Sequence, residues 1–398
     1  MDPRFDIIPQ RRNTGSYKWD SGNPDPDVIP LWVADMDFRV ADPIIEALRA
    51  RVDHGVFGYT QVPAAYYDAV CSWYKRRYDA SVLPEYIIYT QGVVPAISAA
   101  IKALTRPGDG VAILTPVYNC FFSSIRNNGC MRVDVPLVEI DEAGGNFSYE
   151  IDFNRLEEVL SDPRTPVLLF CNPHNPACRA WRREELLKVY ELCRRTNTVL
   201  LSDEIHADLT MPGYKFTPVV SLTPDSAMHT VTFSSPSKAF NTAGLQIANI
   251  ITASPELRYR IDRAINDNEV CDVNPFGVTA LMAAYNHGEE WLDALVPYLH
   301  GNYEMLCEMF RDRLPGVKIA RLEATYLAWV KVTVPLMNNE ELEEMLKDRY
   351  KVWINAGEMY GANGFIRINL ATSRENLRKG LDRLIQGLNE LGYTLRQS

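Results

Sequence analysis

The chain has 398 residues, 46% of them apolar and 23% charged, which is typical of a folded globular protein and argues against disorder. Its formal charge is −10 and it has no dense block of Lys and Arg, which argues against nucleic acids and anionic membranes as partners. The length exceeds that of one ordinary core and predicts one large domain plus a smaller one.

The cysteines and the N-terminal stretch bear on the compartment of the protein. Eight cysteines are scattered without a CxxC pair or clustered histidines, so we expect a reduced, cytoplasmic chain without a metal site. No apolar run is long enough to span a membrane, and the N-terminal stretch lacks the basic-then-apolar order of a secretory signal.

The middle of the chain alternates between short apolar runs and helical patterns. Strands are predicted at 86–90, 110–116, 166–173, 198–204, 230–235 and 246–253. Helices are predicted at 93–105 and 182–195, the second with acids early and bases late, as the helix dipole favours. Near-continuous apolar strands separated by helices predict an α/β fold with a mostly parallel sheet covered by helices on both faces.

The C-terminal part has a different pattern. A long helix is predicted at 291–314. Strands of a separate, antiparallel sheet are predicted at 325–334, 352–360 and 364–372. We therefore place a large domain at 45–285 and a smaller α+β domain at 1–44 together with 286–398.

Ligands of open parallel sheets bind at the carboxyl ends of the strands, so the residues at those ends are the site candidates. Val93 and Val94 open a helix whose free backbone N–H groups suit a phosphate. Polar or aromatic side chains follow the other strands, at Tyr118, Asn175, Asp203, His206, Ser235, Ser237 and Lys238. Taken singly, each has an ordinary structural interpretation as a turn, core, capping or surface residue.

Taken together, these residues form one chemical inventory: a phosphate cradle, an aromatic face, a carboxylate, a hydrogen-bond donor and an amine. A planar pyridine aldehyde that bears a phosphate needs this set. The amine forms the imine, and the carboxylate keeps the ring nitrogen protonated so that the ring accepts electrons. The sequence therefore predicts pyridoxal 5'-phosphate (PLP) as the cofactor.

These residues lie in motifs that resemble those of fold-type I PLP enzymes. More narrowly, the chain resembles the MalY/PatB group of C–S β-lyases, similar to cystathionine β-lyase, within the class I/II aminotransferase family. The motifs span nearly the whole chain in family order and read TGSYKWD, PLWVADMDF, FGYT, QGVVPAI, NPHNP, LSDEIHADL, SSPSKAFNTAGLQ and GFIRINLAT. SDEIHADL with PSKAFN is the most specific pair, and WVADMDF points to the lyase group.

The resemblance implies roles for the catalytic and ring-binding residues. Lys238 resembles the Schiff-base lysine and, once freed by substrate, the base at Cα. Asp203 resembles the partner of the pyridinium nitrogen. Asn175 and His206 stand where the ring hydroxyl is bound, although many aminotransferases have a tyrosine at the position of His206. Tyr118 is similar to the ring that stacks on the cofactor.

The resemblance also implies the phosphate, substrate and subunit contacts. Arg367 resembles the clamp for the substrate α-carboxylate, where a planar guanidinium fork suits two oxygens. Tyr59, in FGYT, is similar to a tyrosine that reaches the cofactor phosphate of the neighbouring subunit, which predicts a homodimer with shared active sites. The phosphate ligands of the same subunit are predicted to be Val93, Val94, Ser235 and Ser237.

Two positions depart from the family pattern. After NPHNP the family usually has a small residue and then glycine, whereas this chain has Cys178 there. A cysteine is strained at the positive φ that glycine accepts, which predicts a differently shaped turn. Gln246 stands where many aminotransferases have a phosphate-binding arginine, although the lyase group tends to read AGLQ.

The implied activity is a PLP-dependent C–S β-lyase that cleaves cystathionine or a related cysteine thioether to thiol, pyruvate and ammonia. An aminotransferase would use the same lysine, aspartate and arginine, so it remains an alternative. A second alternative is a PLP-binding regulatory protein that acts through a protein partner. No DNA-binding segment is evident, which argues against direct regulation at DNA.

Overall fold

The computed structural model describes residues 2–21 and 25–393. Its larger sheet has the strand order β2-β10-β9-β8-β7-β3-β4. The strands are β2 (Ile87–Thr90), β3 (Gly110–Thr115), β4 (Met131–Pro136), β7 (Val167–Cys171), β8 (Val199–Asp203), β9 (Thr230–Ser234) and β10 (Ala248–Ile251). All neighbours are parallel except β10, which runs antiparallel to both β2 and β9. The predicted mostly parallel sheet is confirmed, with β10 as the exception.

The large sheet is covered on both faces, which explains why its strands read as continuous apolar runs. Ile113 packs into a core formed with one set of helices, and its neighbour Leu114 packs into the core on the opposite face. The first set comprises α4 (Val93–Leu104), α5 (Asn119–Asn127) and α8 (Pro255–Asn266). The opposite core includes residues of α3 (Ala64–Tyr78), α6 (Phe153–Leu160), α7 (Arg183–Thr196) and α9 (Pro275–His287).

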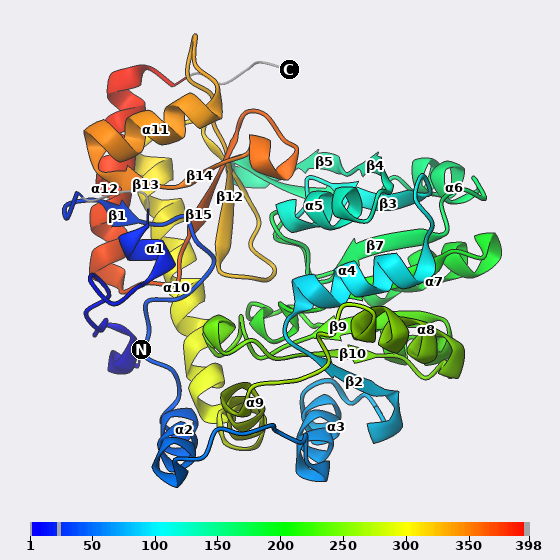
Figure 1. Ribbon diagram of the computed structural model, residues 1–398. Coiled ribbons are helices and arrows are strands. Elements are labelled where there is room, and N and C mark those ends of the chain that lie inside the picture. The colour runs from blue at the N-terminus through cyan, green and yellow to red at the C-terminus, as the bar shows by residue number, and fades with distance from the viewer. Residues whose placement is uncertain (1, 22–24, 394–398) are drawn as a thin grey trace.

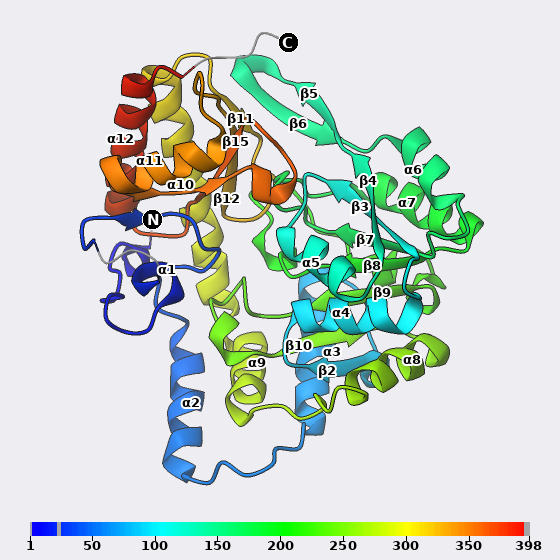
Figure 2. The ribbon, with the colours of Figure 1, turned by 45° about the horizontal axis from the view of Figure 1, so that its top comes forward.

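The second sheet has the order β14-β15-β12-β11-β6-β5. Its strands are β5 (Val138–Asp141), β6 (Asn146–Glu150), β11 (Lys318–Ala320), β12 (Leu327–Lys331), β14 (Asn355–Ala356) and β15 (Phe365–Asn369). The C-terminal strands pair antiparallel, as predicted, with Trp329 opposite Arg367. The β5–β6 hairpin joins this sheet through the parallel pair β6–β11, a connection that the sequence did not indicate (Figure 2).

The N-terminal segment lies with the C-terminal helices (Figure 1). Its strand β1 (Ile29–Pro30) pairs in parallel with β13 (Val352–Trp353), and α1 (Tyr17–Asp20) precedes it. The long helix α10 (Glu289–Arg313) runs beside both sheets, and the remaining helices are α2 (Asp42–His54), α11 (Asn339–Tyr350) and α12 (Arg374–Leu391). The division at 45–285 stays a prediction, with the hairpin of β5 and β6 extending from the larger part into the sheet of the smaller one.

Short 3-10 helices complete the fold. They lie at Pro3–Phe5, Pro84–Tyr86, Ala143–Gly145, Ala207–Leu209, Val219–Ser221, Ser226–Met228, Ala243–Leu245 and Glu358–Tyr360. Within 2–21 and 25–393, no helix combines the length and apolar character that crossing a membrane requires.

Candidate active site

The carboxyl ends of the parallel strands bring the predicted site residues to one edge of the large sheet. Asp203 is the last residue of β8, and Lys238 lies in the turn after β9. Asn175 follows β7, and Tyr118 follows β3 as the residue that caps α5. Since β3, β7, β8 and β9 run in one direction, these four segments leave the sheet on the same side.

The Lys238 amine is held by a backbone carbonyl from a distant part of the chain. Its Nζ donates to the carbonyl oxygen of Ala34 at 2.7 Å. Burial, together with the positive charge of Arg367, lowers the pKa of Lys238 to about 8. At this pKa about a tenth of the amine is neutral at pH 7, a far larger share than in an exposed lysine, which suits a nucleophile or base.

Asp203 is a buried acid with few hydrogen bonds. Its side chain is 3% exposed, and Oδ1 accepts from the backbone N–H of Ile205 at 3.1 Å. Burial raises the pKa of this carboxyl to about 7, against the opposing effects of that hydrogen bond and of the Lys238 charge. A positively charged N–H group placed beside this buried carboxyl would stabilise its ionised form and lower its pKa.

His206 and Tyr118 supply two rings to the same region. His206 is buried, and its Nδ1 has no hydrogen-bond partner among the described residues. Burial and the charges of Lys238 and Arg367 lower the pKa of His206, so its imidazole is neutral. Tyr118 is partly buried, and burial raises the pKa of its phenol. Both rings are therefore uncharged at neutral pH.

Arg367 brings the second sheet to the strand ends of the first. It lies on β15, is 3% exposed and stands over the ring of Tyr360, 4.5 Å from the ring centroid. Nη1 donates to Oδ1 of Asn175 at 3.3 Å, and Nη2 donates to the carbonyl oxygen of Trp32 at 3.1 Å. Nε is buried without a partner among the described residues, so the guanidinium retains a donor for an anion.

The predicted phosphate cradle has two parts on one side of the sheet. Val93 and Val94 form the first turn of α4, directly after β2. The other part is the turn after β9, where the Ser235 hydroxyl donates to the carbonyl oxygen of Ile247 at 2.7 Å and lies 2.5 Å from the Ser237 hydroxyl. Only β10 separates β2 from β9, so the helix start and the serine turn leave neighbouring positions of the sheet edge.

The two departures from the family pattern have different structural outcomes. Cys178 adopts the left-handed φ of +61°, so the turn keeps the conformation of a glycine turn and the expected change of shape is wrong. The buried thiol lies 3.2 Å from the carbonyl oxygens of Pro176 and Leu327, and its single S–H can donate to either one. Gln246 is exposed, also with a positive φ of 52°.

Tyr59 is not brought together with the other site residues. It lies in the connection between α2 and α3, and its side chain is 100% exposed. Val56 and Phe57 beside it are also exposed, although Phe57 packs on Phe276 with ring centroids 5.5 Å apart. Figure 2 shows this connection running between α2 and α3, and none of the hydrogen bonds described above for the site residues involves it.

Sequence reasoning missed the contacts of segment 32–38, which we call the strap. Its carbonyls at Trp32 and Ala34 accept from Arg367 and Lys238, the two cations of the site. The motif WVADMDF pointed to this stretch as characteristic of the lyase group. It could not indicate these hydrogen bonds, because every residue has a backbone carbonyl. Tyr326, which also donates to the Ala34 carbonyl at 2.9 Å, was missed for the same reason.

Comparison with known proteins identifies the family. The model of the family described as aminotransferase class I and II matches residues 18–384. Cystathionine beta-lyase PatB of Bacillus subtilis is 41% identical over 97% of this chain and 100% of its own length. Protein MalY of Escherichia coli is 31% identical over 96% of this chain and 98% of its own. The chain therefore belongs to the class I and II aminotransferase family, in the group that contains PatB and MalY.

Solved structures agree with this assignment. Cystalysin from Treponema denticola, whose crystal structure contains pyridoxal 5'-phosphate, matches with a TM-score of 0.93 and 36% identity, over 98% of this chain and 100% of that one. The PLP-bound C–S lyase from Staphylococcus hominis matches with a TM-score of 0.88 and 32% identity, over 98% and 100%. The predicted fold type I is thereby confirmed.

Proposed function

We propose that this protein is a PLP-dependent C–S β-lyase that cleaves cystathionine or a related cysteine thioether to thiol, pyruvate and ammonia. One observation carries the proposal: an amine with a lowered pKa, a buried acid with a raised pKa and a buried guanidinium meet at one sheet edge. Their presence in a chain 41% identical to a cystathionine β-lyase supports elimination at a C–S bond.

The residues fit the cofactor. The buried Nδ1 of His206, which has no partner among the described residues, and the strand-end carboxyl of Asp203 match a ring that offers polar atoms on its edge. Lys238 would bind the aldehyde and Asp203 the ring nitrogen. The remaining PLP-binding residues are proposed to be Asn175 and His206 at the hydroxyl, Tyr118 at the ring face, and Val93, Val94, Ser235 and Ser237 at the phosphate.

Bound PLP supplies an electron sink for the electrons released at Cα of the substrate. Asp203 holds a proton at the ring nitrogen, which keeps that sink effective. Arg367 binds the α-carboxylate and so fixes which bond at Cα faces Lys238. Lys238, with a pKa of about 8, takes the Cα proton as its neutral amine. The Ala34 carbonyl of the strap contacts Lys238, and the buried ring of Tyr360 contacts Arg367.

The proposal extends to assembly, organisation and compartment. The exposed Tyr59 favours a two-fold homodimer in which this residue reaches the phosphate of the neighbouring subunit. The division into a large part at 45–285 and a smaller part at 1–44 and 286–398 places the site between the two sheets, because Arg367 lies on one and Lys238 beside the other. The scattered cysteines favour a cytoplasmic location.

The decisive assay incubates purified protein and PLP with cystathionine in the absence of any keto acid, and measures pyruvate and free thiol. We expect both products, and none with Lys238→Ala. Turnover that requires an added keto acid would identify an aminotransferase instead. Cofactor binding with neither activity would identify the regulatory alternative.

A further inference from the structure

The strap at 32–38 connects the two cations of the site. The Ala34 carbonyl accepts from Nζ of Lys238 at 2.7 Å and from the Tyr326 hydroxyl at 2.9 Å. The Trp32 carbonyl accepts from Nη2 of Arg367 and from Nδ2 of Asn355, both at 3.1 Å. The position of the strap therefore determines where both cations can lie.

Two asparagines bind the strap from either side. Asn241, three residues after Lys238, accepts from the N–H of Met36 at 2.9 Å and donates to the carbonyls of Met36 and Phe38, each at 3.0 Å. Asn369, two residues after Arg367 on β15, donates to the carbonyls of Val33 and Asp35. The strap is thus fastened to the lysine turn and to the arginine strand.

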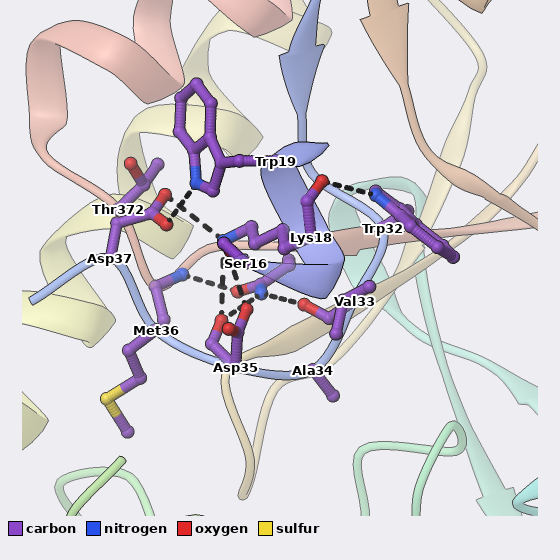
Figure 3. A network of polar contacts seen from close by, with 12 residues as sticks. Ser16, Lys18, Trp19, Trp32, Val33, Ala34, Asp35, Met36, Asp37 and Thr372 are labelled. Atoms are coloured by element: carbon purple, nitrogen blue, oxygen red, sulfur yellow. Dashed lines mark hydrogen bonds and ion pairs between the residues drawn. The ribbon is translucent and has the colours of Figure 1, made fainter. Parts of the chain in front are cut away.

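A buried ion pair joins Asp37 of the strap to Lys18 of α1 (Figure 3). Nζ of Lys18 is 3.1 Å from Oδ2 of Asp37, and both side chains are 0% exposed. Oδ1 of Asp37 also accepts from Trp19 at 2.8 Å and from Arg11 at 3.0 Å. Lys18 further donates to the carbonyl of Asp35 at 3.4 Å, so Lys18 contacts the strap at both Asp35 and Asp37.

We propose that Lys18 and Asp37 are positioning residues that hold the strap so that the Ala34 carbonyl orients the free amine of Lys238. This proposal rests on the assignment of Lys238 as the cofactor lysine. The free amine is the form present before the cofactor binds and again after substrate has replaced it.

The physical reason is geometric. A neutral amine that donates one N–H to Ala34 has its lone pair directed away from that carbonyl, where it can attack an aldehyde or take a proton. Buried ion pairs add little net stability compared with apolar side chains. In this proposal the role of the Lys18–Asp37 pair is instead to hold the strap in one position relative to α1. A strap displaced by an ångström would lose the 2.7 Å bond and leave Lys238 among several rotamers.

The test compares Lys18→Met with a matched control. Lys18→Met removes the cation, while Asp37 keeps Arg11 and Trp19 as partners, so the chain is expected to fold. The control is Glu185→Gln, which removes a charge from a buried pair with Arg179 that involves no residue of the strap. Melting temperature, the rate of covalent PLP capture followed by absorbance, kcat and KM are measured for both.

We expect Lys18→Met to slow covalent capture and to lower kcat by roughly 10- to 100-fold, because reactive groups lose their alignment, while KM and the final amount of bound PLP change less than about twofold. Glu185→Gln should leave the capture rate and kcat near wild type, even if its melting temperature falls as much as that of Lys18→Met. Equal behaviour of the two variants would overturn the proposal.

A milder variant covers the case in which Lys18→Met does not fold. Trp19→Phe removes the indole hydrogen bond to Asp37, keeps an aromatic ring beside Arg12, and should slow capture in the same direction by a smaller factor. An unchanged capture rate in this variant would also overturn the proposal. A wild-type protein that captures PLP but releases no pyruvate would contradict the proposed lyase function and leave the capture comparison intact.

Discussion

The strand-end cluster around Lys238 and the connection between α2 and α3 both carry residues that the sequence assigns to one site, yet their surroundings differ. Lys238, Asp203 and Arg367 lie among buried groups and have hydrogen-bond partners within the chain. Tyr59 is fully exposed. Site residues whose partners all lie in one chain can be recognised there by their burial and hydrogen bonds. A residue that acts in the site of a second subunit is instead exposed in its own chain.

The largest expected effect comes from Lys238→Ala. This variant should fold but lose covalent PLP attachment and at least about 10³-fold of its turnover, because both the anchor and the base are removed. Borohydride reduction of the wild type followed by peptide mapping should place the pyridoxyl label on Lys238. A label on any other lysine contradicts the assignment of the strand-end cluster.

Asp203→Asn should reduce turnover by roughly 10²- to 10³-fold, while PLP affinity changes much less. An amide cannot hold the ring nitrogen protonated, whereas the phosphate contacts remain. Steady-state kinetics check the expected loss of turnover, and a PLP titration of the same preparation checks the expected PLP affinity. Near-wild-type turnover would show that Asp203 is an ordinary buried acid.

The same variant makes a prediction for stability in the cofactor-free protein. The pKa of Asp203 is raised from 3.8 to about 7, so the folded state binds more protons than the unfolded state between these values. The wild type should therefore lose stability as pH rises from 4 to 7, by up to about 4 kcal/mol from this group. The advantage of Asp203→Asn in urea unfolding should grow from pH 4 to pH 8, and a difference independent of pH would contradict the buried acid.

Arg367→Lys should raise KM for the amino acid by about 10- to 100-fold, because a point ammonium replaces a bidentate fork in hydrogen bonds to a charged group. Decarboxylated analogues lack the group that Arg367 binds, so their turnover should be low in the wild type and little changed in the variant. Equal turnover of amino acids and decarboxylated analogues by the wild type would contradict the assignment of Arg367 as the residue that binds the α-carboxylate.

The smallest effect, and the sharpest test of the comparison, concerns Tyr59. Tyr59→Phe should weaken PLP binding by about tenfold, since one hydrogen bond to a charged acceptor is lost. At a PLP concentration that leaves most Tyr59→Phe sites empty, mixing this variant with Lys238→Ala under conditions that exchange subunits should raise activity above either parent, because one site of the mixed dimer carries neither change. No rise would indicate that Tyr59 serves its own subunit, and a monomer in sedimentation at assay concentration would contradict the shared site.

Much of the fold and the core of the candidate site could be predicted from local sequence. Buried strands read as apolar runs, and the residue that follows such a run lies at the sheet edge, so Asp203 and Lys238 could be located from their own neighbourhoods. The antiparallel direction of β10 could not be located in this way, because an apolar run does not record the direction of its neighbour.

The sequence by itself determined which residue types stand at the strand ends, because the apolar pattern of a strand and the residues that follow it are neighbours in the sequence. Only the tertiary structure decided which distant groups meet them. Arg367 reaches Asn175 across 192 positions, and Lys238 reaches the Ala34 carbonyl across 204. The second contact is made to a backbone carbonyl oxygen, which every residue has, so it cannot be predicted from residue type. Its position follows from strand pairing and from the buried pair of Lys18 and Asp37, which only the folded chain brings together.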